Sequence, residues 1–480
     1  MIVKMVQNIH EIIYKYNLPL DRNGQPVYIY LQNYYEAYLK ELQKIFEFGS
    51  KADFPDGFYE KMEKIHFSML KKQCDLIVKI LEMESYQGNE RYMLLDELMR
   101  MLIAADAFRY LPCKKSDIMV RVRSGEESFE RKDMLHIPSE KRAISPSQRF
   151  NQPGDVCLYM SFYPEMRLFA DDMLEVTWRE CGMPKQFWYS IFEVQEELYF
   201  LHLGKKGSTY LEEYDMSVTE EKKKDRLKAI EQYLLTFPLR AAICISIEDK
   251  FNEKKTEYHE EYVFPQLLAQ WLQGNSKFDG LTYQSSLKLP ETKKSKSYNV
   301  VIPIKNLNVV SGYDAKIKKA FKVSLPVKVD FYDKLKVLED KLKKVCQYAQ
   351  ELEIKLALHQ GSQVHPYYSL LEICYSFESI CSAMKNVTET HMVTLYRQVS
   401  ALNHMTRLVS KTIRTVQTAE EWIDLYKSYS NDAVLTVNDY QDILLKFKVI
   451  EDAVFSLRGI ISIDEIRKHI FSPPDYQFVE

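Results

Sequence analysis

Arginine and tyrosine side chains gather around turns in the middle of the chain. Arg121 and Arg123 alternate at the end of an apolar run, and Arg149 opens the turn that leads into residues 156–160. A guanidinium group can hold a phosphate through two parallel hydrogen bonds. Tyr159 lies in the run that follows, and a tyrosine ring packs well on a flat aromatic ring. These residues predict a ligand with phosphate groups and an aromatic base.

Small donors and acids complete this set. Tyr283, Ser285 and Ser286 form part of a second turn-strand unit, and a serine hydroxyl is a compact hydrogen-bond donor. Two carboxylates, Asp171 and Asp172, follow the run that contains Tyr159. Each of these residues taken alone is more often structural, so the prediction of a nucleotide-like ligand depends on the whole set.

A second pattern lies near the C-terminus. Arg397 and His404 are seven residues apart, or two helical turns, so both side chains would share one helix face. Helical ribonuclease toxins have a similar arginine-to-histidine spacing. Cys374 and Cys381 lie on an apolar stripe, where cysteine is usually part of the core. The ten histidines show no H-x-x-x-H or H-E-x-x-H spacing, so no metal site is predicted.

Composition narrows the class of protein. At roughly 150 residues per domain, 480 residues predict about three domains. Glycine is scarce, with 14 residues, which disfavours a glycine-rich phosphate loop and favours long helices. A formal charge of −3 gives no basic excess for nucleic-acid binding. The short lysine runs at 222–224 and 293–296 are interpreted as solvated charge.

The sequence predicts no secretory or membrane segment. Residues 1–18 mix charged and apolar side chains, which is typical of an amphipathic helix and not of a signal peptide. No apolar run approaches the 18 residues of a membrane span. The eight cysteines form no C-x-x-C pair, which fits a reducing compartment. We therefore expect a cytoplasmic protein without membrane contact.

Two helical flanks and a mixed centre must position the candidate residues. Apolar residues three and four apart predict N-terminal helices over 1–18, 27–48, 57–83 and 89–110. Heptad stripes after residue 325 predict an antiparallel bundle. Such a seam could also join two copies of the chain, an interpretation that ranks below packing within one chain.

The centre carries short runs that are rich in β-branched residues. They predict strands over 118–122, 156–160, 198–201, 241–247 and 300–304, with helices near 220–235 and 265–272. The predicted fold class is α+β. The predicted domains are an N-terminal helical domain over 1–112, a mixed domain over 113–325 and a C-terminal helical bundle over 326–480.

The order of short blocks between residues 118 and 305 resembles the RES-domain family, which is named for Arg, Glu and Ser residues. No single block is specific, and the resemblance rests on their shared order. The blocks are Arg121-Val122-Arg123, His136-Ile137-Pro138 with Arg142, the R-F-N-x-P-G-x-x-x-L-Y stretch from Arg149 to Tyr159, Phe237-Pro238-Leu239, Glu261-Tyr262 with Pro265 and Trp271, Asp279-Gly280-Leu281 with Tyr283 and Ser285, and Tyr298–Lys305.

The resemblance implies a fold similar to that of ADP-ribosyltransferases and cleavage of the nicotinamide–ribose bond of NAD, with water or phosphate as acceptor. NAD is the substrate, and no other cofactor is implied. The implied catalytic residues are Arg121, Tyr159, Asp171 and Ser285. The implied NAD-binding residues are Arg123, Arg149, Asp172, Tyr283 and Ser286.

The acid departs from the family pattern. Counting without gaps from Tyr159, the family glutamate falls on Ala170. Asp171 is next in the chain, and its side chain is shorter than glutamate by one methylene. A misplacement of about 1 Å can lower a rate on the order of 100-fold.

Many RES-domain proteins are toxins with antitoxin partners, so the resemblance implies an antitoxin or another regulatory partner. The helical flanks exceed what an NAD-degrading domain needs, and we expect them to restrain or regulate a toxin or antiphage effector. One alternative is a catalytically degenerate RES-like module that binds a nucleotide or a partner. Another is a ribonuclease that uses Arg397 and His404.

Overall fold

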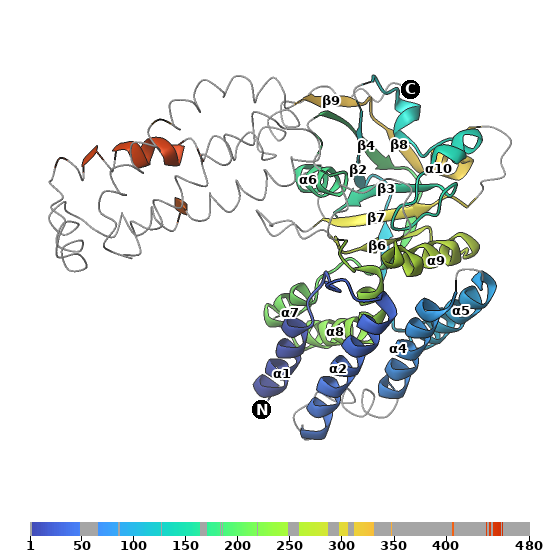
Figure 1. Ribbon diagram of the computed structural model, residues 1–480, viewed down its shortest axis with the longest axis vertical. Coiled ribbons are helices and arrows are strands. Elements are labelled where there is room, and N and C mark those ends of the chain that lie inside the picture. Colours follow the sequence, from blue (N-terminus) through green and yellow to red (C-terminus); the bar gives the residue numbers. More distant parts are fainter. Residues whose placement is uncertain are drawn as a thin grey trace.

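The protein is an α+β protein in which a nine-stranded sheet lies beside a layer of helices (Figure 1). The predicted C-terminal bundle, with Cys374, Cys381, Arg397 and His404, lies almost entirely outside the described residues. The computed structural model describes residues 2–48, 66–84, 87–125, 127–163, 170–182, 184, 186–217, 219–247, 259–286, 297–305, 312–330 and a few later positions.

The helical layer confirms the predicted N-terminal helices. α8 is buried on all sides over residues 229–243, and α2 packs its tyrosines against it, where the Tyr38 and Phe237 rings lie 4.7 Å apart. The helices are α1 (Ile2–Lys15), α2 (Val27–Phe48), α4 (Phe67–Glu82), α5 (Gly88–Ala104), α7 (Gly207–Asp215) and α8 (Glu220–Ile243). The part of the predicted segment 57–83 that precedes residue 66 lies outside the described residues.

Two predicted boundaries are wrong. The helix predicted to reach residue 110 ends at Ala104, because Asp106 takes a left-handed backbone conformation with φ of 52°. The strand predicted over 241–247 does not form: residues 241–243 are the last of α8, which continues through Pro238, and Ile245 forms an isolated bridge with Leu20. Proline lacks the N–H that would bind the carbonyl of Leu234, and the Tyr38 hydroxyl donates to that carbonyl at 3.1 Å instead. This contact lets the helix persist across a residue that normally ends one.

The sheet runs in the order β1-β5-β6-β7-β3-β2-β4-β8, with β9 paired to β4. β5 and β6 are parallel, and the other neighbours are antiparallel. The strands are β1 (Tyr110–Cys113), β2 (Ile118–Ser124), β3 (Cys157–Phe162), β4 (Gln186–Val194), β5 (Leu198–His202), β6 (Gly280–Tyr283), β7 (Tyr298–Pro303), β8 (Phe321–Val323) and β9 (Val327–Asp330). The strands predicted over 118–122, 156–160, 198–201 and 300–304 are confirmed.

The remaining helices cover the two faces of the sheet (Figure 1). One face carries Tyr159 and packs on the helical layer; we call it the Tyr159 face. The other carries Arg121 and packs on η3 and α10; we call it the Arg121 face. The covering elements are α6 (Ala170–Glu180), α9 (Glu260–Gly274), α10 (Ala315–Ala320) and the 3-10 helix η3 (Arg131–Met134); a second 3-10 helix, η4 (Ser139–Ile144), has no buried residue.

One hydrophobic core joins the N-terminal helices to the Tyr159 face. It contains Ile77 and Leu98 of the helical layer together with Leu281 and Val301 of the sheet. The division of the chain at residues 112 and 325 stays a prediction. No helix within the described ranges is long and apolar enough to cross a membrane.

Candidate functional site

Arg149 lies at the centre of the Tyr159 face and is held by main-chain carbonyls. It is 4% exposed, and its Nη1 and Nη2 donate to the carbonyls of Ile243 and Ile245 at 3.1 and 2.9 Å. Its guanidinium lies 5.3 Å from the centre of the Tyr262 ring in α9. Nε is buried without a hydrogen-bond partner. Arg149 is therefore a positioned cation with one unused donor.

The two predicted tyrosines meet beside Arg149. The Tyr159 hydroxyl donates to Asn151 Oδ1 at 2.8 Å and accepts from the Phe150 amide at 3.1 Å, which ties β3 to the Arg149 turn. The Phe150 ring lies 4.7 Å from that of Tyr283. Burial raises the pKa values of both hydroxyls well above the usual range, so both tyrosines are neutral.

The serines follow Tyr283 along the same wall. The Cys244 thiol donates to the carbonyls of Gln284 and Ser285, both at 3.5 Å, and the Ser246 hydroxyl donates to the Ser286 carbonyl at 2.9 Å. These bonds dock the end of β6 onto the segment that follows α8. Ser285 is half-buried, whereas Ser286 is 2% exposed. Ser285 is therefore better placed to meet a ligand.

A carboxylate that is not among the predicted site residues reaches this cluster. Glu180, the last residue of α6, accepts a hydrogen bond from Asn299 Nδ2 at 2.8 Å. Asn299 pairs with Tyr283 in the β6–β7 ladder, so both lie on the Tyr159 face. Burial raises the pKa of the Tyr283 hydroxyl, the negative charge of Glu180 raises it further, and the positive charge of Arg149 lowers it. Glu180 and Arg149 are thus an acid and a cation that share one tyrosine neighbour.

A helical pattern in the sequence could have found Glu180. Met173, Thr177 and Glu180 follow the i, i+4, i+7 spacing of one helix face. Met173 and Thr177 are buried against the sheet, and the Thr177 hydroxyl lies 2.6 Å from that of Ser161 in β3. An acid that continues a buried stripe is a useful signal of a functional carboxylate.

The structure separates Arg121 and Arg123 from this cluster. β2 pairs with β3 so that Val120 lies opposite Ser161. Side chains alternate along a strand, so Arg121 and Arg123 lie on the opposite face from Tyr159. Arg121 donates to the carbonyls of Met134 and Leu135 in and beside η3. The arrangement therefore brings Arg149, Tyr159, Tyr283 and the serines together without Arg121 or Arg123.

The predicted acids are described only in part. Asp171 and Asp172 lie in the first turn of α6, and their side chains fall outside the described part of the structure. Glu180 lies nine residues after Asp171, about 13 Å along the helix axis. The two candidate acids therefore belong to opposite ends of one helix. The catalytic and NAD-binding assignments stay predictions.

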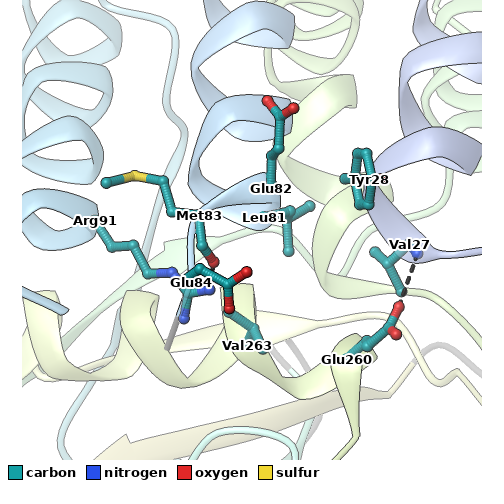
Figure 2. A pocket seen from close by; sticks show the side chains of 9 residues that line it. All are labelled: Val27, Tyr28, Leu81, Glu82, Met83, Glu84, Arg91, Glu260 and Val263. Atoms are coloured by element: carbon teal, nitrogen blue, oxygen red, sulfur yellow. Dashed lines mark hydrogen bonds between the residues drawn. The ribbon is translucent and has the colours of Figure 1, made fainter. Parts of the chain in front are cut away.

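A hollow of about 460 Å³ lies elsewhere, between α2, α4, α5 and the start of α9 (Figure 2). Arg91 and Glu84 lie on one side of it, and Glu260 lies on the other, where its Oε2 accepts from the Val27 amide at 3.0 Å. It contains none of the residues predicted to act on a ligand. Within the described part of the chain, no group of three or more histidine, cysteine or acidic residues is arranged to hold a metal ion.

Comparison with known proteins finds a distant relative. The chain is similar to a protein of Bacillus subtilis (strain 168) named "Putative toxin YopC", with 28% identity over 331 residues, which are 66% of this chain and 69% of the relative. No family model matches the chain. No solved structure matches it. The RES-domain resemblance therefore rests on the sequence blocks.

Proposed function

We propose that this chain is a toxin that cleaves the nicotinamide–ribose bond of NAD at the Tyr159 face. The observation that carries the proposal is the convergence of Arg149, Tyr159, Tyr283 and Ser285, four residues that the RES-domain resemblance assigns to NAD chemistry. They come from three separate segments of the chain. The similarity to a protein named as a toxin supports the same biological role.

The proposed reaction breaks the bond between the ribose carbon and the nicotinamide nitrogen. The electron pair leaves with neutral nicotinamide, and positive charge develops on the ribose. A fixed carboxylate stabilises that charge. Water then adds to the ribose carbon and loses a proton, which yields ADP-ribose. With phosphate as acceptor, the product is ADP-ribose bearing a phosphate on the same carbon.

The residues of the Tyr159 face take distinct roles in this proposal. Glu180 supplies the carboxylate, because Ala170 holds the aligned family position and Asn299 already orients Glu180 beside Tyr283. Arg149 attracts the pyrophosphate, so that binding energy remote from the reacting bond positions it. Tyr159 holds the Arg149 turn in place, and Ser285 orients the ribose or the acceptor.

The buried position of the cluster supports regulation by the N-terminal helical flank. Arg149 and Tyr283 are 4% and 5% exposed, so a dinucleotide could contact either side chain only if the described residues around it moved. Residues 18–22, part of the connection between α1 and α2, lie against the end of β6 and the segment after α8, and we propose that they cover the cluster. The Leu18 carbonyl accepts from Gln284 Nε2 at 3.3 Å, and the Leu20 amide donates to the Cys244 carbonyl at 2.9 Å. An antitoxin or trigger acts by keeping or releasing this cover.

A nicotinamide-release assay tests the proposed function. Purified full-length protein is incubated with NAD, in water alone and with added phosphate, and the products are separated. Release of nicotinamide with ADP-ribose, or with its phosphate ester, is the expected result. Failure of well-folded protein to release nicotinamide, including after the segment 18–22 is loosened by substitution, would remove the catalytic claim.

A non-catalytic module is the second candidate, because Ala170 replaces the family acid and the cluster is buried. Such a module would bind NAD or another nucleotide without consuming it. Calorimetric binding of NAD with no nicotinamide release would favour it over the enzyme. Cleavage of RNA would instead favour the ribonuclease hypothesis for Arg397 and His404, residues that lie outside the described part of the chain.

A further inference from the structure

The Arg121 face contains two guanidinium groups without counter-ions. Arg121 is 9% exposed, and within the described part of the chain neither it nor Arg123 forms an ion pair. Both donate to carbonyls at the end of η3, and all of these bonds start from Nη1. Burying a cation without a compensating charge is costly. The arrangement therefore favours an added anion.

The unused edge of each guanidinium has the geometry for an oxyanion. Because Nη1 makes the bonds to η3, the Nε and Nη2 donors of both arginines remain without a described acceptor. These two nitrogens point the same way in a planar fork that matches two oxygens of a phosphate or carboxylate. Arg121 and Arg123 are two residues apart in β2, so both forks lie on one face.

Two further donors lie across the strand pair. Ser190 in β4 is opposite Arg121, is 0% exposed, and its hydroxyl has no hydrogen-bond partner among the described residues. Trp188 is opposite Arg123, and its indole N–H is likewise buried and unpaired. Leaving a buried donor unpaired typically costs about 1–3 kcal/mol. An acceptor-rich ligand that lies over the β2–β4 pair on the Arg121 face would satisfy both.

An aromatic ring ties the two strands together at this point. The Phe129 ring lies 4.8 Å from the Arg123 guanidinium and 6.0 Å from the Trp188 ring. Arg123 and Trp188 therefore approach one common neighbour.

The surrounding ionisable groups leave the positive charge in excess. Asp133 is the one described carboxylate whose charge affects Arg123, and its Oδ2 accepts from the Glu130 amide. His136 has both ring nitrogens engaged, by the Ile137 carbonyl at 2.7 Å and the Asp314 amide at 2.8 Å, which fits a neutral ring. Burial, followed by the charge of Arg123, lowers the pKa of Arg121 to about 9.

We propose that the Arg121 face binds a phosphate group, held by the Nε and Nη2 edges of Arg121 and Arg123 and by the Ser190 and Trp188 donors. This site lies on the opposite side of the sheet from the proposed NAD-cleaving cluster and does not depend on it. A bound phosphate would link η3 to β2 and β4, and so would stabilise this side of the molecule. Inorganic phosphate and a phosphomonoester such as AMP share the required chemistry.

Binding to the full-length protein tests the proposal. Calorimetry with inorganic phosphate and with AMP is compared with chloride at equal ionic strength, and thermal unfolding is followed in parallel. Phosphate or AMP should bind and raise the Tm, whereas chloride should not. Tighter binding of AMP would identify a phosphomonoester as the ligand, and equal binding would identify free phosphate. Absence of both effects in the wild-type protein overturns the site.

Three variants locate the binding. Arg123→Gln removes one fork and should weaken phosphate binding about tenfold or more. Ser190→Ala should also weaken it while the fold is kept, because the hydroxyl has no described partner to lose. Lys132→Gln is the matched control: it removes an exposed cation in η3 that pairs with Glu130 at 2.7 Å. Phosphate affinity equal to that of the wild type in both Ser190→Ala and Arg123→Gln contradicts the proposed site, and so does a loss in Lys132→Gln as large as theirs.

Discussion

At the scale of single residues, the two ends of α6 offer alternative acids for the same reaction. Glu180 is oriented by Asn299, whereas Asp171 lies about 13 Å away along the helix. We predict that Glu180→Gln lowers the rate of nicotinamide release about 100-fold or more, as expected when a charge-stabilising group is lost. Asp171→Asn should change the rate little. The reverse order of effects would transfer the role to Asp171.

A second residue-scale prediction concerns His202 in β5. Burial, with repulsion from Arg240 as the next cause, holds the pKa of His202 well below the usual 6.5, and its ring lies 2.8 Å from the Thr282 hydroxyl. Below pH 6.5 the unfolded chain binds a proton at this histidine and the folded chain does not. The free energy of unfolding therefore falls as the pH drops below 6.5.

The contribution of His202 can be measured by urea unfolding at pH 7 and pH 5. In His202→Asn the loss of stability between these values should be smaller than in the wild type, by up to about 2 kcal/mol at 1.36 kcal/mol per pH unit. Identical losses in the two proteins would show that His202 gains its proton in the folded state as readily as in the unfolded chain.

At the scale of elements, α8 depends on a tyrosine from α2. The Tyr38 hydroxyl satisfies the Leu234 carbonyl that Pro238 leaves without a partner. Tyr38→Phe should lower the free energy of unfolding by about 1–3 kcal/mol, because that buried carbonyl loses its donor. Tyr14→Phe serves as the control, since Tyr14 is 60% exposed. Equal unfolding midpoints in urea for the two variants would show that α8 crosses Pro238 unaided.

The cover formed by residues 18–22 can be locked in place. Leu20 and Ile245 are paired in an isolated parallel bridge. A disulfide between Leu20→Cys and Ile245→Cys should suppress nicotinamide release when oxidised and restore it on reduction. Leu20→Cys alone is the control for other thiols. Unchanged release from the oxidised double variant would show that substrate enters without movement of this segment.

The sequence indicated the elements better than their pairing. Short apolar runs correctly predicted β2 and β3, whereas β4 is buried on both faces and shows no clean alternation. The faces of Arg121 and Tyr159 depend on the β2–β3 register, in which Val120 pairs with Ser161. A shift of one residue would have put both side chains on one face. A single sequence carries no direct record of that register, which is why the candidate site was predicted as one cluster.

At the scale of the whole molecule, the sheet divides the predicted site into two basic regions. Arg149 serves the Tyr159 face, beneath the helical layer, and Arg123 serves the opposite face beside η3. The core beneath the Tyr159 face includes N-terminal helices, so the flank and the proposed catalytic cluster are packed as one unit. We therefore expect a change in the N-terminal helices to alter the cluster directly.

The most direct test compares the two faces in one assay of nicotinamide release from NAD. Arg149→Gln and Arg123→Gln each remove one arginine, and each variant is checked for folding by circular dichroism. We predict that wild-type protein releases nicotinamide, that Arg149→Gln loses the activity and that Arg123→Gln retains it. Loss of release in Arg123→Gln with full activity in Arg149→Gln would contradict the placement of NAD cleavage on the Tyr159 face.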